Sequence, residues 1–212
     1  MKFSSAVLLP LVVAAAQLPE LRTEPIGGGT VFFVKNISTQ PLTGYLIELV
    51  NYPGSSYSLW QDEITAEPIP PGGEKRIQVT NMTAGAVPDY MHLTAAIFAD
   101  GSTAGVPEKV TQFIERRRFV LETTRELIRR IERGPKINIV IADFGRWADS
   151  LQPVGKVKQN SQPVINQAAA RSLVASTAAK LESHKLDADP IKETLASLRA
   201  SERSLAASKP GL

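Results

Sequence analysis

The sequence predicts an α+β protein in which an antiparallel β-sandwich comes first and a helical region follows. Residues 31–50 hold two β-rich runs around a polar Asn-Ile-Ser-Thr-Gln-Pro turn, which is typical of a hairpin in a small sandwich. Residues 68–73 are rich in proline and glycine, so they form a turn between strands. Beyond Pro107 the apolar residues recur at helical spacing instead of alternating.

Residues 1–16 predict a cleaved signal peptide. Lys2 is a short basic region, residues 3–13 are apolar, and Ala14-Ala15-Ala16 supplies the small residues of a cleavage site after Ala16. An uncleaved anchor is the alternative, but the apolar run is shorter than the roughly 20 residues that a spanning helix needs. We therefore expect an exported protein, periplasmic or secreted, with no membrane span. It has no cysteine, so core packing alone must hold the fold.

The sandwich domain is predicted over residues 30–106, after a leader at 17–29. Turn residues bound five candidate strands, at about 30–36, 43–50, 57–64, 74–80 and 91–99. Five strands are few for a sandwich, so we expect residues 21–26 to add an edge strand or a helix to cover an edge.

A helical extension is predicted over residues 107–151, packed on the sandwich. Proline suits the first helical position and an acid suits the positive end, so Pro107-Glu108 marks a helix start, and Gly134-Pro135 ends that helix. A second helix is expected from Ile137 to Leu151, with a strand at 137–142 as the alternative. Opposite charges at helical spacing predict two local ion pairs, Glu122 with Arg125 and Glu126 with Arg130.

A helical hairpin tail is predicted over residues 163–208, after a polar linker at 152–162. Asp189 and Pro190 are a cap and a first helical residue for its second helix. Because the apolar stripe of the tail is thin, we expect the tail to dock on the rest of the chain or on another molecule.

Two stretches of the chain resemble known exported domains. VKNISTQPLTGYLIELVNYPG followed by PIPPGGEKRIQV resembles the FxLYD-like group of small extracellular β-sandwiches over about residues 30–100, which implies an immunoglobulin-like fold. The positions of the signature Phe, Leu, Tyr and Asp hold Ile47, Leu49, Val50 and Asn51, so only the leucine is identical. AAIFADGSTAGVPEKVTQFIERRR looks like exported bacterial sandwich-plus-helix proteins of unassigned role. Neither resemblance implies a catalytic residue or a cofactor.

The charges divide the chain into an acidic front and a basic back. Residues 30–106 carry three basic and seven acidic side chains, whereas 107–133 carry eight and five, and 134–212 carry eleven and seven. The halves can pack together and cancel, or the basic part can contact an anionic surface such as phospholipid or envelope polymer. No nucleic-acid partner is predicted, because an exported protein is separated from the nucleic acids of the cell. The candidate basic contact face consists of Arg116, Arg117, Arg118, Arg125, Arg129 and Arg130.

The sequence predicts no metal or cofactor, and a hydrolase is the last of the alternative functions. Gly101–Gly105 lies between a strand and a helix, as a nucleophile elbow does, but its central residue is Thr103 and the only downstream histidine is the distant His184. His92 and His184 share no metal-ligand spacing.

The predicted function is a non-enzymatic interaction or structural module of the bacterial cell envelope. Its basic helices would bind an envelope protein, which the sequence does not identify, or a second copy of the chain through the tail. The alternative is a module that binds a glycan or peptide through aromatic residues near a sandwich loop. The candidate contacts for that alternative are Tyr52, Tyr57 and Trp60.

Overall fold

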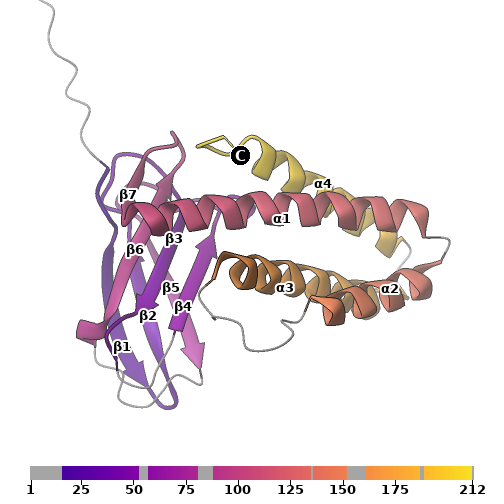
Figure 1. Cartoon of the computed structure of the whole chain (residues 1–212), viewed down its shortest axis with the longest axis horizontal. Coiled ribbons are helices and arrows are strands. Elements are labelled where there is room, and N and C mark those ends of the chain that lie inside the picture. The colour runs from indigo at the N-terminus through magenta and orange to yellow at the C-terminus, as the bar shows by residue number, and fades with distance from the viewer. Residues whose placement is uncertain are drawn as a thin grey trace, which may run out of the picture.

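The computed structural model describes residues 16–52, 57–80, 88–134, 136–151, 161–186 and 189–211. Within these ranges the chain forms seven strands in two antiparallel sheets, a short 3-10 helix (Pro88–Tyr90) and four α-helices (Figure 1). The prediction of an α+β chain with its strands first and its helices second is therefore confirmed. The predicted signal peptide lies outside the described residues, except for Ala16.

The first sheet contains β1 (Glu20–Ile26), β2 (Gly29–Lys35) and β5 (Glu74–Thr80), in the order β1-β2-β5. β1 and β2 form a hairpin whose turn places Gly28 at a φ of 76°, a conformation that glycine adopts without strain. The edge strand expected from residues 21–26 is thus present, inside the segment predicted as a leader.

The second sheet contains β4 (Tyr57–Asp62), β3 (Leu42–Leu49), β6 (Met91–Phe98) and β7 (Thr103–Gly105), in the order β4-β3-β6-β7. Every residue of β3 is buried. The first sheet covers one face of β3 and the first helix covers the other. Tyr45, Ile47 and Leu49 therefore belong to the core between the sheets, while Leu46 belongs to the core under the helix.

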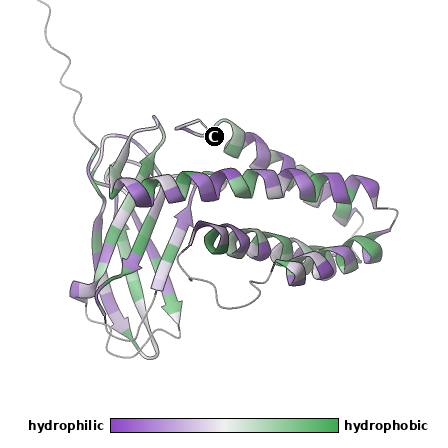
Figure 2. Ribbon diagram, viewed as in Figure 1, coloured by the Kyte–Doolittle hydropathy of each residue, from purple (hydrophilic) through white to green (hydrophobic). Residues whose placement is uncertain are grey.

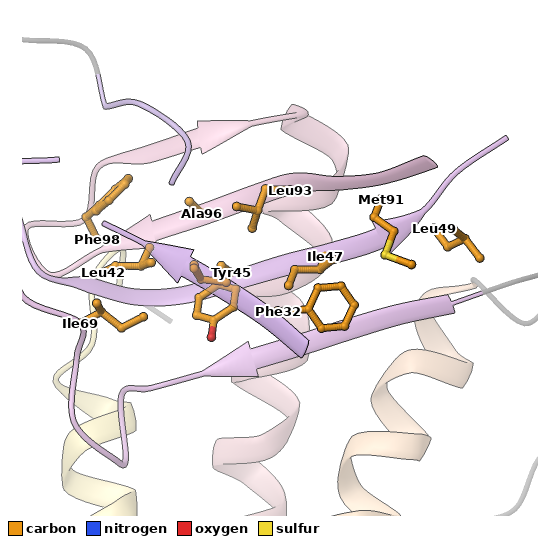
Figure 3. Packing of buried hydrophobic residues seen from close by; sticks show 11 residues of the cluster. Phe32, Leu42, Tyr45, Ile47, Leu49, Ile69, Met91, Leu93, Ala96 and Phe98 are labelled. Atoms are coloured by element: carbon orange, nitrogen blue, oxygen red, sulfur yellow. The ribbon is translucent and has the colours of Figure 1, made fainter. Parts of the chain in front are cut away.

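The core between the sheets is built from alternate residues of facing strands. Figure 3 shows Phe32 of β2 near Tyr45 and Ile47 of β3, with Leu93 of β6 on the other side and Phe98 of β6 at one end of the core. All five are buried, so this two-sheet unit is held together by apolar packing.

The helical region consists of α1 (Pro107–Arg133), α2 (Ile137–Ser150), α3 (Gln162–Ser183) and α4 (Pro190–Ala206). α1 begins on the second sheet and continues well beyond it, and α3 and α4 pack along it (Figure 1). Residues 137–142 are helical, so the strand alternative is wrong. None of the helices in the described ranges is long and apolar enough to cross a membrane.

The tail docks on its own chain. α3 packs against both α1 and α2, and α4 packs against α1. Apolar and polar residues are interspersed along all four helices (Figure 2), and the apolar ones meet in a second core. That core includes Leu127, Phe144, Val174 and Leu198, one from each helix.

Candidate ligand-binding cleft

α1 is fixed on the second sheet by the side chain of Arg117, which is fully buried. Its Nε and Nη2 donate to the two carboxylate oxygens of Asp62 on β4, at 2.9 and 2.8 Å, and Nη2 also donates to the carbonyl of Thr43 at 3.2 Å. Gly44 makes this approach possible: a Cβ there would lie 2.8 Å from the Phe113 ring and 2.9 Å from Arg117 Nη2.

A second anchor joins α1 to β3 nearer the start of the helix. The carboxylate of Glu48 is buried, and it accepts hydrogen bonds from Lys109 Nζ at 2.7 Å and from Thr94 Oγ1 at 2.8 Å. The charge of Glu48 is therefore already compensated by a neighbouring cation.

Between these anchors lies a cleft of about 310 Å³, bounded by β4, α1 and α3. Trp60 of β4 lines it and packs on Phe113 with the ring centroids 5.6 Å apart. Its polar lining comes from the sheet and α1: Glu48, Ser58, Lys109 and Arg116. Its opposite wall is one stripe of α3: Val164, Ile165, Ala168, Ala169 and Ser172.

The spacing of these residues explains why they meet. Glu48 is paired with Ser58 in the β3–β4 register, and Leu46 with Trp60, so Ser58 and Trp60 point to the same face of the sheet, toward the helices. Lys109 and Arg116 are seven residues apart on α1, which is about two helical turns and hence one face. The small side chains on the α3 stripe leave the space that larger ones would fill.

Arg116 is the unusual group in this cleft. It is half-buried, and it makes no hydrogen bond or ion pair within the described part of the chain. Its guanidinium carbon lies 6.0 Å from the centroid of the Trp60 ring. Burial lowers the pKa of Arg116; Asp62 opposes this shift and Arg117 adds to it. Because an arginine stays protonated in proteins, the wall of the cleft carries a partly desolvated cation.

The local charges do not cancel. Lys109 is balanced by Glu48, and Arg117 is balanced by Asp62, whose two oxygens it occupies. Among the five ionised groups that the described residues place in the cleft and its anchors, Arg116 is therefore one positive charge in excess. A buried charge without a partner is unfavourable, so this position favours an incoming anion.

The three aromatic residues predicted as ligand contacts do not form one platform. Tyr52 packs edge-on against Tyr90, with the centroids 5.2 Å apart, and Tyr57 stacks on Phe32 at 6.1 Å on the side of the two-sheet core. Trp60 points the other way, because residues three apart in a strand lie on opposite faces. Of the three, Trp60 alone lines the cleft. The loop residues 53–56 lie outside the described residues.

The six arginines predicted as a basic contact face lie in different environments. Arg117 is in the interior and Arg116 lines the cleft. The other four bind acids of the helical region: Arg118 binds Glu115, Arg125 binds Glu122 and Glu202, Arg129 binds Glu126, and Arg130 binds Glu126 and Asp143. The two predicted helical ion pairs are confirmed among these.

The Gly101–Gly105 motif forms the turn between β6 and α1 together with the short β7. Gly101 and Gly105 have φ angles of 92° and 107°, so the backbone conformation accounts for glycine at both positions and no catalytic role is needed. Asp100 accepts hydrogen bonds from the backbone and hydroxyl of Ser102, and these bonds lower its pKa. The described residues hold no group of three or more His, Cys, Asp or Glu side chains placed to bind a metal ion.

Comparisons of the chain with models of protein families, with curated proteins and with solved structures found no match. The interpretation of the cleft therefore depends on its own geometry. Sequence reasoning named Trp60 and Arg116 but did not connect them, and it missed Glu48, Ser58 and Lys109. The seven-residue spacing of Lys109 and Arg116 was the available signal for part of this site.

Proposed function

We propose that this chain is a non-enzymatic binding module that holds an anionic ligand in the cleft between β4, α1 and α3. One observation carries the proposal: Arg116 is a half-buried cation without a partner in the described residues, and it lines a cleft beside an aromatic ring. An anion placed there recovers the free energy that burial of the charge costs. Pockets with apolar walls and a few polar groups are the usual form of small-molecule sites.

The cleft is a better candidate than the basic surface of α1. Arg118, Arg125, Arg129 and Arg130 already bind acidic side chains of the same helical region. An acidic partner would have to compete with those acids, and exposed ion pairs of this kind contribute little free energy. Arg116 has no such competitor among the described residues.

We also propose that the module is located outside the inner membrane and that its own two sheets form an immunoglobulin-like scaffold. Support for export comes from the sequence pattern of residues 1–16. Support for the scaffold comes from two antiparallel sheets of three and four strands packed across an apolar core.

The test is a titration of the protein with small anions, namely acetate, phenylacetate and inorganic phosphate, followed by calorimetry and by NMR shifts. We expect at least one anion to bind and Arg116→Gln to weaken it by about tenfold to a hundredfold, since a hydrogen bond to a charged group contributes about 1.5–3 kcal/mol. Arg118→Gln is the matched control, because it removes the same charge from the neighbouring exposed position. An unchanged affinity in Arg116→Gln would contradict the proposed site.

A further inference from the structure

The geometry points to a ligand class: a small monocarboxylate with an apolar body, its carboxylate on Arg116 and its body between Trp60 and α3. This inference rests on the proposed function, because it names the ligand of the same cleft. Three properties of the cleft support it: the balance of its charges, the difference between the polar groups at its two ends, and its apolar wall.

The charge balance selects a single negative charge. The other cations, Lys109 and Arg117, are each bound to a carboxylate, so Arg116 leaves an excess of one. A monocarboxylate neutralises that excess. Inorganic phosphate carries more than one negative charge near neutral pH, so it would exceed the single positive charge that is free. The planar fork of arginine matches two oxygens of a carboxylate or of a phosphate, so the amount of charge makes the distinction here.

The two ends of the cleft differ along the sheet. Trp60 and Arg116 mark one end, and Ser58, Glu48 and Lys109 mark the other. Two residues of strand separate Trp60 from Ser58, a rise of about 7 Å. At the far end Lys109 is already paired with Glu48, so no free cation is left there for a second carboxylate on the ligand, whereas the hydroxyl of Ser58 can hydrogen-bond a neutral polar group. The cleft therefore disfavours dicarboxylates.

The remaining surface is apolar. Trp60 and a stripe of α3 both line the cleft, and in that stripe Val164 and Ile165 lie one turn before Ala168. A volume of about 310 Å³ is at the lower end of the range for small-molecule pockets. It suits a body such as one aromatic ring or a short branched chain, and apolar contact with Trp60 adds to the affinity.

The experiment compares phenylacetate with probes that each lack one of its properties. Phenylacetate has the charge and the ring, phenylacetamide keeps the ring without the charge, acetate keeps the charge without the ring, and adipate and inorganic phosphate test the other anions. Dissociation constants are measured by calorimetry on the whole protein. We expect phenylacetate to bind at least tenfold more tightly than each of the other four probes.

Two pairs of variants locate the binding. Arg116→Gln should make the affinities for phenylacetate and phenylacetamide equal, and Arg118→Gln should leave the preference intact. Ala168 is exposed and lines the apolar side of the cleft, so Ala168→Phe should place a ring in the cleft and weaken the binding of phenylacetate by at least tenfold. Ala179→Phe adds the same ring to an exposed position of α3 outside the cleft and should have no effect. Circular dichroism confirms that each variant is folded.

The outcomes separate the ligand class from the proposed function. If phosphate or adipate binds through Arg116 more tightly than phenylacetate does, the monocarboxylate inference is overturned and the anion-binding function stands. If phenylacetamide binds as tightly as phenylacetate, charge recognition is overturned. If none of the anions binds the wild-type protein, both the inference and the proposed function are wrong.

Discussion

At the scale of single residues, the buried side chain of Arg117 joins α1 to the second sheet. Arg117 is buried between β4 and α1, and Asp62 binds it with both carboxylate oxygens. We expect Arg117→Ala to lower the free energy of unfolding by about 3–5 kcal/mol, because it leaves the carboxylate of Asp62 without its partner. Urea unfolding followed by circular dichroism measures the change.

The double variant Arg117→Met with Asp62→Leu tests whether that loss comes from the uncompensated charge on Asp62 or from the missing hydrogen bonds of Arg117. Replacing a whole buried ion pair by apolar side chains of similar volume is often neutral or stabilising. We therefore expect the double variant to be more stable than Arg117→Ala. If it is equally unstable, the loss does not come from an uncompensated charge on Asp62, and the hydrogen bonds of Arg117 are what the junction needs.

Gly44 is needed for close approach and not for backbone freedom. A methyl group there would come within 2.9 Å of Phe113 and Arg117, both of which are buried. We expect Gly44→Ala to cost about 1–3 kcal/mol of unfolding free energy, as overpacking usually does. Gly145 in α2 is the matched control: it has open space around it, so Gly145→Ala should stabilise the helix by up to about 1 kcal/mol. A neutral Gly44→Ala would contradict the close contact.

Tyr57 makes the stability depend on alkaline pH. Burial raises its pKa to about 12, and an unfolded tyrosine titrates near 10. The unfolded state therefore loses its proton first, so the stability that Tyr57 contributes is complete below about pH 10 and is lost as the pH rises toward 12. We expect Tyr57→Phe to weaken this alkaline loss, measured by urea unfolding at pH 9, 10 and 11.

The same variant should cost little at neutral pH. The hydroxyl of Tyr57 is buried and has no hydrogen-bond partner in the described part of the chain, so removing it breaks nothing there. Burial also raises the pKa of Tyr45, which hydrogen-bonds Glu63, so part of the alkaline loss will remain in Tyr57→Phe. An alkaline loss identical to that of the wild type would show that Tyr57 is not its source.

At the scale of elements, the starts of α3 and α4 offer a matched comparison. The side chain of Asp189 caps α4 by accepting the backbone N–H of Lys192 at 3.0 Å, as the sequence predicted. Ser161 occupies the same position before α3, but its side chain makes no cap bond. We expect Asp189→Ala to cost about 1 kcal/mol and Ser161→Ala to cost less. Thermal unfolding of the two variants measures the difference, and equal losses would contradict it.

The features of the helices and strands that neighbouring residues determine could be predicted, whereas those that depend on residues far apart in the sequence could not. The start of α1 at Pro107 and the cap at Asp189 follow from neighbouring residues, and both were predicted correctly. The burial of Arg117 was not predicted, because three successive arginines fan over most of the helix circumference and the sequence does not show which of them faces inward. Its burial depends on the pairing of β3 with β4 and on Gly44, which are far from it in the sequence.

The cleft needs still longer-range information. Opposite directions for Tyr57 and Trp60 follow from strand periodicity, so that much was within reach of the sequence. That Trp60 would face the Ala-rich stripe of α3, more than a hundred residues later, was not. The thin stripe of α3 predicted docking correctly but not the surface on which the helix docks.

At the scale of the whole molecule, the acidic front and the basic back of the chain meet where α1 crosses the second sheet. Asp62 and Glu48 come from the acidic part, and their partners Arg117 and Lys109 come from α1. Part of the charge asymmetry is therefore used inside the molecule to join its halves. The cation left over at this junction, Arg116, is the basis of the proposed binding site.

This junction predicts that the two halves unfold together. Leu198 of α4 is buried in the helical core, so we expect Leu198→Ala to lower the unfolding free energy by about 2–5 kcal/mol. In a Trp147→Phe background, fluorescence reports Trp60 on the sheet, whereas circular dichroism at 222 nm reports mainly the helices. Both signals should shift to the same lower urea midpoint. Leu186→Ala, at a position that is 93% exposed, should shift neither. A separate, earlier helical transition would mean that the helices fold independently of the sheets and that the buried ion pairs do not couple them.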